Sequence, residues 1–389
     1  MESIDSSEMR QINSNLVLKL IWQRSEISRS EIARLTGMSR STISAIVSDL
    51  IALRLVVEEG GGQVKSGRRP INLHFQHETY SLMGIDIGLQ HLTFVVSDLR
   101  GQILSKDVQP CDVAGDPESA IALIQKHADK EIEAAANSGR DVIGIGIGVP
   151  CPVHPKRMQS PMSADYLPAW KNFDLLDRMV KRYQMPIFFE NDANLGALAE
   201  LWWGRDRGES TNIAFVKLGS QVGAGLIIDG KIHRGSRGMT GEIGQVILNL
   251  SDKPEMIAKG SFGTVQSWID AVIAKGVSSE DLFDEGAFFL GVGLCNLLSL
   301  LDLDEVVFGG NFPQPGERLI ERMKEGVKLF GANKQDVTLS WSQLGDSQIA
   351  VGAATMVLER ALNDISVFPE PRKEKPAPLV WKGGRFIHG

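Results

Sequence analysis

Fifteen residues decide the fold of the N-terminal region: Ser30-Glu31-Ile32-Ala33-Arg34-Leu35-Thr36-Gly37-Met38-Ser39-Arg40-Ser41-Thr42-Ile43-Ser44. Ser28 or Ser30 can cap a helix, and that helix ends at Gly37, where glycine readily adopts the left-handed conformation of a tight turn. A second helix follows, capped by Ser39, and its apolar residues share one face: Ile43, Ile46, Val47 and Leu50. The spacing predicts a helix-turn-helix.

The flanking residues extend this unit in both directions. A helix is predicted upstream, because Leu16, Val17, Leu20 and Ile21 fall on one helical face. Downstream, short apolar strands at 55–58 and 71–75 flank a loop rich in glycine and basic residues. This order predicts a winged helix-turn-helix over residues 1–76. The helical pattern alone also fits an ordinary helical hairpin, and the loop alone fits a solvated linker.

The same region contains candidate DNA contacts. Short polar or basic side chains at the start of the reading helix suit base edges and phosphates, and basic side chains of a wing suit a minor groove or the backbone. The candidates are Ser39, Arg40, Ser41, Thr42 and Ser44 on the helix and Lys65, Arg68 and Arg69 in the wing. A double-stranded DNA operator is therefore the expected partner.

Charge and composition agree with a DNA-binding part attached to an acidic remainder. Residues 1–80 contain ten Lys/Arg and nine Asp/Glu, whereas the rest of the 389-residue chain contains 31 and 39. Two or three domains are expected at this length. There is no run of eighteen apolar residues and no secretory leader, and the three cysteines are far apart in sequence. We expect a cytoplasmic protein with reduced thiols and no membrane partner.

A strand pattern occurs twice in the remainder of the chain. A strand at 82–85 is followed by Gly88, another strand and Asp98; a strand at 215–218 is followed by Gly219, another strand and Asp229. In both copies the glycine lies ten residues before the aspartate. The repeat predicts two related α/β lobes around a cleft that suits a small ligand.

Four further stretches resemble a known family: 144–150, 190–200, 218–230 and 234–244. With them, residues 10–360 resemble the ROK family of repressors, open reading frames and sugar kinases. The resemblance implies an α/β fold, a two-lobed actin-like body (ribonuclease H-like, sugar kinase/ASKHA) behind the winged helix-turn-helix. It implies a first lobe at 77–195, a second lobe at 196–350, a closing helix at 350–364 and a polar tail at 365–389.

The resemblance also implies a sugar site. In the family, the residues that match Asn191 and Asp192 bind sugar hydroxyls, the aspartate is the catalytic base of the kinases, and the acid that matches Glu242 lies at the same site. Gln245 and Gln266 stand where the family has histidine and glutamate, and amides still bind hydroxyls. Independently, Asn191 and Asp192 follow an apolar strand, where α/β proteins bind ligands. An Asx turn that caps the next helix fits the pair equally well.

The phosphate loops depart from those of the ROK kinases, which read Asp-x-Gly-Gly-Thr at the first loop. This chain reads Asp86-Ile87-Gly88-Leu89-Gln90-His91, which puts two side chains, Leu89 and Gln90, where the kinases leave room for phosphate. The second loop has Gln221 and Ala224 in place of glycine. A glycine-rich stretch such as 219–225 by itself fits either a phosphate cradle or a tight hairpin. Because phosphoryl transfer needs a closely fitting cradle, we expect no kinase activity, no catalytic residue and no cofactor.

The family's zinc ligands are replaced as well. Gln245 stands for the histidine, and Ile257, Lys259 and Thr264 stand for the three cysteines. These side chains cannot replace imidazole and thiolates around zinc, so we expect no metal.

The combined features predict a sequence-specific transcriptional regulator, a repressor of sugar metabolism genes. Its DNA affinity is expected to depend on a sugar bound between the lobes. A homodimer is expected, because helix-turn-helix regulators match half-sites in pairs. Two alternatives stay open. One is a ROK-type sugar kinase with an appended DNA-binding head, which the retained Asp192 supports, and the other is an inert body whose DNA binding ignores ligand.

Overall fold

The computed structural model describes residues 6–24, 26–60, 63–64, 67–68, 71–155, 162, 166–205, 210–246, 264–275, 280–310, 316–330, 337–369, 379–382 and 385–388. Its internal contacts divide the chain into two units. The head unit comprises residues 1–79 and 359–389, and the body unit comprises residues 80–358.

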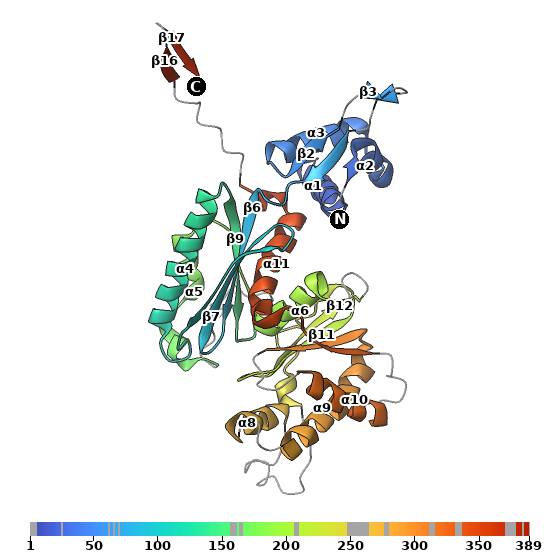
Figure 1. Ribbon diagram of the computed structural model, residues 1–389, viewed down its shortest axis with the longest axis vertical. Coiled ribbons are helices and arrows are strands. Elements are labelled where there is room, and N and C mark those ends of the chain that lie inside the picture. Colours follow the sequence, from blue (N-terminus) through green and yellow to red (C-terminus); the bar gives the residue numbers. More distant parts are fainter. Residues whose placement is uncertain are drawn as a thin grey trace. The chain divides into compact units, whose positions relative to one another are not determined.

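Three helices of the head unit follow the predicted order: α1 (Ser6–Gln23), α2 (Arg29–Thr36) and α3 (Arg40–Ala52) (Figure 1). The Ser28 side chain caps α2 and the Ser39 side chain caps α3, and Gly37 between them has a φ of 72°. Val17 and Ile21 of α1 are buried as expected, but Leu16 is 43% exposed and Leu18 is buried instead. The helix-turn-helix is confirmed, with the face of α1 rotated slightly from the predicted one.

The wing is built from short antiparallel strands. β2 (Val56–Glu59) pairs with β5 (Asn72–Phe75), and β5 also pairs with β1 (Ile27–Ser28). β3 (Gln63–Val64) and β4 (Gly67–Arg68) form a separate pair between β2 and β5 in sequence. The winged helix-turn-helix fold therefore agrees with the sequence prediction.

The C-terminal segment contributes to the head unit. Here the structure differs from the polar tail that the sequence suggests at 365–389. The 3-10 helix Ile365–Val367 ends beside Phe368, which is only 4% exposed, and its first residue is hydrogen-bonded to α1. β16 (Leu379–Lys382) and β17 (Arg385–His388) form an antiparallel pair. The start of this segment is thus attached to α1, while the polar character of the rest stays a prediction.

The body unit contains two five-stranded sheets of the same topology. The first has the order β10-β9-β6-β7-β8 and the second has the order β15-β14-β11-β12-β13. In each, three antiparallel strands are followed by two parallel ones. Their bounds are β6 (Tyr80–Ile87), β7 (His91–Asp98), β8 (Ile103–Pro110), β9 (Asp141–Val149), β10 (Ile187–Asn191), β11 (Ile213–Lys217), β12 (Gly223–Ile228), β13 (Lys231–Ile232), β14 (Glu305–Gly309) and β15 (Thr338–Trp341). The duplicated pattern in the sequence is thus a duplicated lobe.

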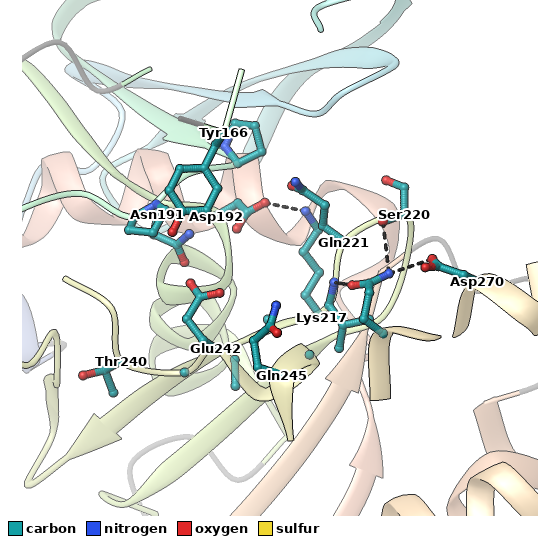
Figure 2. A pocket seen from close by; sticks show the side chains of 18 residues that line it. Tyr166, Asn191, Asp192, Lys217, Ser220, Gln221, Thr240, Glu242, Gln245 and Asp270 are labelled. Atoms are coloured by element: carbon teal, nitrogen blue, oxygen red, sulfur yellow. Dashed lines mark hydrogen bonds and ion pairs between the residues drawn. The ribbon is translucent and has the colours of Figure 1, made fainter. Parts of the chain in front are cut away.

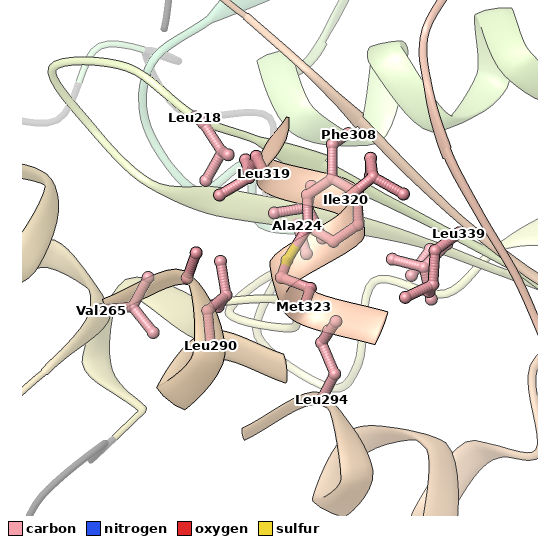
Figure 3. Packing of buried hydrophobic residues seen from close by; sticks show 14 of the residues in the cluster. Leu218, Ala224, Val265, Leu290, Leu294, Phe308, Leu319, Ile320, Met323 and Leu339 are labelled. Carbon is pink, nitrogen blue, oxygen red and sulfur yellow. The ribbon is translucent and has the colours of Figure 1, made fainter. Parts of the chain in front are cut away.

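Helices cover the outer face of each sheet. In the first lobe, α4 (Pro117–Asn137) and α5 (Leu175–Arg182) lie on one face of the sheet (Figure 1). In the second lobe, the sheet packs against α8 (Val265–Lys275), α9 (Glu280–Leu301) and α10 (Gly316–Phe330). Figure 3 shows Leu290, Leu319 and Met323 of these helices packed beside Phe308 of the sheet. Each lobe therefore has its own apolar core.

Two further helices, α6 (Asp192–Trp203) and α11 (Gln348–Asn363), pack on the inner faces of the two sheets. Glycines allow this close approach: a Cβ at Gly84 would lie 1.9 Å from the Ala350 carbonyl oxygen of α11, and one at Gly146 would lie 2.0 Å from that of Ala353. A Cβ at Gly225 would likewise lie 2.1 Å from the Ala193 carbonyl oxygen of α6. The α6 helix begins at the edge of the first sheet, which places Asp192 between the lobes.

Candidate functional site

The body unit has a cavity of about 360 Å³ between its lobes (Figure 2). The first lobe supplies Tyr166, Asn191 and Asp192 to its wall, and the second lobe supplies the 220–224 loop, Glu242, Gln245, Gln266 and Asp270. A cavity of this size matches a small-molecule ligand. The lining is rich in carboxylate, amide and hydroxyl groups, which suits a ligand with many hydroxyls.

All five side chains that the sequence nominates for a sugar line this one cavity: Asn191, Asp192, Glu242, Gln245 and Gln266. Asn191 ends β10 and Asp192 begins α6. Glu242 precedes the 3-10 helix Ile243–Gln245, which carries Gln245, and Gln266 lies in the first turn of α8. Residues as far apart as 191 and 266 therefore meet at one site.

Asn191 serves the backbone as well as the cavity. Its Oδ1 accepts hydrogen bonds from the Ala193 N–H at 3.0 Å and the Asn194 N–H at 3.2 Å, so it is the N-cap of α6. Its Nδ2 donates to the Cys151 carbonyl oxygen at 3.3 Å. The capping alternative raised by the sequence is thus realised, and it holds Asn191 and Asp192 in a fixed orientation at the cavity wall.

Beneath the cap lies a buried carboxylate that sequence reasoning did not single out. Glu190 is 2% exposed, and its Oε1 accepts from the Asn191 N–H at 2.9 Å and from Asn194 Nδ2 at 3.0 Å. Its Oε2 accepts from Arg234 Nε at 2.5 Å. Since Arg234 follows β13 of the second lobe, this ion pair joins the two lobes next to Asn191.

A second unforeseen cation, Lys217, contacts Asp192. Lys217 is the last residue of β11, and its Nζ donates a hydrogen bond to Asp192 Oδ2, with side chains 17% and 8% exposed. Burial lowers the pKa of Lys217, but the charges of Asp192 and Asp86 outweigh it, and the pKa is raised overall. The ammonium is therefore firmly protonated beside the aspartate that the family's kinases use as a base.

The first phosphate loop is occupied by a histidine. The His91 ring lies over Gly88, so that a Cβ on Gly88 would lie 2.3 Å from His91 Cε1. His91 Nε2 is 3.5 Å from Asp86 Oδ2, and the hydrogen bond to Asp86 raises the pKa of His91. Leu89 instead packs against the core of the first lobe. The obstruction by Leu89 and Gln90 that the sequence suggests stays a prediction, and the structure adds His91 as a side chain that lies over Gly88.

Glu242 and Gln266, two of the three remaining cavity residues, differ in their hydrogen bonding. Burial, reinforced by the charge of Asp192, raises the pKa of Glu242. Gln266 Oε1 accepts from the Val222 N–H at 2.9 Å, while its Nε2 donates to Asp270 Oδ1 at 2.8 Å. Gln266 therefore holds the 220–222 loop against α8, in addition to facing the cavity. The Gln266 side chain thus stabilises the 220–222 loop, in which Gln221 replaces a glycine of the ROK kinases.

Of the four positions that replace the family's zinc ligands, Ile257 and Lys259 lie outside the described residues. Gln245 faces the cavity, and the Thr264 Oγ1 is hydrogen-bonded to Ser267 at the start of α8. Within the described part of the chain, no three His, Cys, Asp or Glu side chains are grouped to hold a metal ion. The absence of a metal stays a prediction.

The candidate DNA-contacting residues of the helix lie at the start of α3. Ser39 Oγ accepts from the Thr42 N–H at 3.1 Å and lies 2.8 Å from the hydroxyls of Ser41 and Thr42. Arg40, Ser41 and Ser44 are exposed. In the wing, Arg68 belongs to β4, whereas Lys65 and Arg69 lie outside the described residues.

Arg29 ties the reading helix to the wing. Its Nη1 donates to the Ser44 carbonyl oxygen of α3 at 3.1 Å, and its Nε donates to Glu58 Oε1 of β2 at 2.8 Å. The sequence gave no hint of this link, because its partners lie 15 and 29 residues away. It fixes the start of the wing relative to α3.

Comparison with known proteins agrees with both parts. A winged helix-turn-helix DNA-binding family model matches residues 12–57, and the ROK family model matches residues 82–264. The xylose repressor of Caldicellulosiruptor bescii is 27% identical over 93% of this chain and 98% of the repressor. The fold and the cavity define a two-lobed, sugar-kinase-like body joined to a DNA-binding head. Residues 82–264 thus match the ROK family, and residues 12–57 match a winged helix-turn-helix.

Solved structures share the fold. A ROK family transcriptional regulator, a homologue of the Escherichia coli MLC protein, covers 92% of this chain with a TM-score of 0.74 and 21% identity, over 98% of its own length. A ROK family glucokinase from Streptomyces griseus, in complex with glucose and AMPPNP, covers 71% of this chain and 98% of its own, with a TM-score of 0.55 and 25% identity. Among the described helices, none is long and apolar enough to cross a membrane.

Proposed function

We propose that this protein is a sugar-responsive transcriptional repressor, which binds operator DNA through the head unit and an uncharged sugar in the cavity of the body unit. The observation that carries the proposal is the meeting of Asn191, Asp192, Glu242, Gln245 and Gln266 in one cavity of a chain that also has a winged helix-turn-helix. Full-length similarity to a protein named as a xylose repressor supports it.

The DNA side of the proposal rests on the start of α3. Exposed Arg40, Ser41 and Ser44 are hydrogen-bond donors at a helix N-terminus, where such side chains contact base edges and phosphates in winged helix-turn-helix proteins. The wing arginines Arg68 and Arg69 add phosphate contacts. Arg68→Ala or Arg69→Ala is expected to weaken binding to all sequences alike and to reduce the salt dependence by about one counterion.

The sugar side of the proposal rests on the lobes. A sugar that contacts Asp192 of the first lobe and Glu242 of the second would favour a closed arrangement of the lobes over an open one. It changes the DNA affinity to the extent that it binds the closed and the open arrangement with different affinity. A homodimer on a palindromic operator would turn this closure into a change in the spacing of two heads.

The test is a titration of DNA binding with sugars. Duplexes selected from a randomised library by the full-length protein give the operator, and fluorescence anisotropy then measures its affinity with D-xylose, D-glucose or N-acetyl-D-glucosamine. We expect at least one sugar to change the DNA affinity by about tenfold, within the usual range of allosteric coupling. Glu242→Gln should bind the same DNA but respond less. Unchanged affinity with every sugar would contradict the effector role.

The enzymatic alternative is a sugar kinase with a DNA-binding head, and Asp192 is the observation that favours it. Two side chains argue against it: Lys217 is paired with Asp192, and His91 lies over Gly88 in the loop that corresponds to the kinases' first phosphate loop. A base paired with an ammonium is a weak proton acceptor, so we propose that the body does not phosphorylate sugar. A coupled assay of ADP release with ATP and the same sugars decides, and sustained turnover above background would favour the kinase.

A further inference from the structure

Lys217 occupies a position that nothing in the proposed function requires to be charged. It ends a strand that is otherwise apolar, Ile213-Ala214-Phe215-Val216, with each of these residues buried. Lysine is rarely buried without a partner. Its neighbours across the sheet are Gly223 of β12 and Gly309 of β14, so no side chain stands beside it on either strand. Lys217 is therefore the one charged residue of this strand, and its side chain needs a partner of opposite charge.

The ammonium at the end of this side chain stands among carboxylates. Asp192 Oδ2 accepts its hydrogen bond, and the charge of Asp86 on β6 also acts on it. Asp86 is 3% exposed, and its Oδ1 has no hydrogen-bond partner among the described residues. Asp86 also has His91 of β7 beside it, with His91 Nε2 3.5 Å from Asp86 Oδ2, so Asp86 lies between His91 and Lys217.

The pairing directs the Asp192 carboxylate. Its Oδ1 accepts from the Ala193 N–H at 2.7 Å and its Oδ2 accepts from Lys217, so both oxygens are held by the protein. An ionised carboxylate has about four acceptor sites, and two of them remain for ligand hydroxyls. Figure 2 shows Asp192 and Lys217 joined at the wall of the cavity, with Glu242 on the opposite side.

We propose that Lys217 is a positioning residue for the sugar, because its ammonium fixes the Asp192 carboxylate as a charged, oriented acceptor for two ligand hydroxyls. The inference rests on the proposed sugar binding and adds a role that the other cavity residues do not share. Three charged groups act near Asp192: Lys217 on β11, Asp86 on β6, and Glu242 on the loop before the 3-10 helix. Asp270 on α8 also lines the cavity, and the Glu190–Arg234 ion pair lies next to Asn191.

Loss of the ammonium has a consequence beyond geometry. Without Lys217, Asp192 and Glu242 face one cavity as two carboxylates, and a sugar that expels water from between them forces one carboxylate to take up a proton. Sugar binding to such a variant is therefore linked to proton uptake, whereas binding to the wild type is not. A side chain with a merely structural role would change affinity but not this proton count.

Isothermal titration calorimetry in two buffers of different ionisation enthalpy measures that count. The full-length protein is titrated at pH 7 with D-xylose, D-glucose and N-acetyl-D-glucosamine, and the tightest of these sugars is kept as the probe. Lys217→Met and Lys217→Gln are then compared with the wild type. Lys217→Gln removes the charge but keeps a polar hydrogen-bond donor, so it decides the outcome if Lys217→Met does not fold. Lys231→Met, at an exposed lysine of the same sheet, is the matched control.

We expect both Lys217 variants to bind the probe about tenfold more weakly, which is the loss in affinity expected when a charge-assisted hydrogen bond is removed. We also expect them to take up several tenths of a proton more than the wild type on binding. Lys217→Arg should restore most of the affinity and the wild-type proton count, and Lys231→Met should match the wild type. An unchanged proton count in the Lys217 variants, whatever their affinity, would overturn the inference. Absence of binding to the wild type would instead refute the proposed sugar site, and the inference with it.

Discussion

Asn15 of α1 is hydrogen-bonded to the last residue of α11, although 348 positions separate them in sequence: Asn15 Nδ2 donates to the Asn363 carbonyl oxygen at 2.5 Å. Asn15 Oδ1 accepts from the Ile365 N–H at 3.1 Å, so one amide satisfies two backbone groups at the end of the helix. Gln11 Nε2 and Lys19 Nζ, one helical turn before and after, donate to Asp364 and Asn363. These hydrogen bonds attach residues 363–365 to α1 within the head unit.

The first prediction concerns that contact. Asn15→Ala leaves two backbone groups without protein partners and should lower the free energy of unfolding of the head unit by about 1–3 kcal/mol. It should also reduce the effect of sugar on DNA affinity more than it reduces sugar affinity itself. Urea denaturation and the anisotropy titration measure the two effects. Gln23→Ala, at an exposed residue of the same helix, is the control, and equal loss of coupling in both variants would contradict the prediction.

The second prediction separates helix capping from DNA binding at Ser39. Ser39→Ala removes the N-cap of α3 and should lower stability by about 0.5–2 kcal/mol. Ser39→Asp keeps a capping side chain, so stability should be retained, but its negative charge faces the phosphates and DNA affinity should fall at least tenfold. Thermal denaturation and anisotropy measure the pair. Should Ser39→Asp bind DNA as tightly as the wild type, the start of α3 does not approach the duplex.

The third prediction is a pH dependence of stability from Glu200. Burial raises the pKa of Glu200 from 4.5 to about 7, with Ser342 lowering it and the charge of Glu305 adding to the rise. The folded-state pKa thus exceeds the unfolded one. This carboxyl therefore contributes stability that is complete below about pH 4.5 and is lost as the pH rises through 7, by about 1.4 kcal/mol per unit at most.

Glu200→Gln removes this contribution to the pH dependence of the free energy of unfolding. The variant should therefore be more stable than the wild type at pH 8, by up to about 3 kcal/mol. Urea unfolding at pH 5, 6, 7 and 8, followed by tryptophan fluorescence, measures it, since Trp202 and Trp203 lie on the same helix. Glu133→Gln, at an exposed acid of α4, controls for the change in net charge. Parallel pH profiles for Glu200→Gln and the wild type would refute the assignment.

The fourth prediction concerns the ion pair between the lobes. Arg234→Met leaves the Glu190 carboxylate buried with one oxygen unpaired, and it should destabilise the body by about 2 kcal/mol, less than for a fully buried pair because Arg234 is 29% exposed. Sugar affinity should fall too, since Glu190 accepts the N–H of Asn191. Calorimetry and urea denaturation test this against Arg237→Met, at an exposed arginine of the same loop. Arg234→Lys should recover only part of the loss, because the guanidinium geometry is not reproduced.

The features that sequence could predict are those encoded locally. Ser28, Ser39 and Gly37 act on residues within one helical turn, so the helix-turn-helix could be located to within a few residues. The five cavity residues were found through a family pattern, and their meeting in one cavity agrees with that pattern.

Long-range pairs could not be predicted in the same way. Lys217 and Arg234 find their partners 25 and 44 residues away, and no periodic pattern encodes such pairings. A signal existed for Lys217, since a lysine that ends an otherwise apolar strand needs a carboxylate nearby. The position of His91 over Gly88 could not be predicted either, because a loop sequence does not show which of its side chains lies over the glycine.

The contact between α1 and residues 363–365 has a consequence for how the protein is made. The ribosome synthesises α1 and the reading helix well before the residues that hydrogen-bond Asn15. An N-terminal domain ordinarily folds as a unit while the rest of the chain is still being translated. Here the head unit lacks three anchoring side-chain contacts until translation has passed through the entire sensing body. A nascent or prematurely terminated chain therefore has a weakened DNA-binding unit, and a fully stabilised reader emerges only together with its sensor.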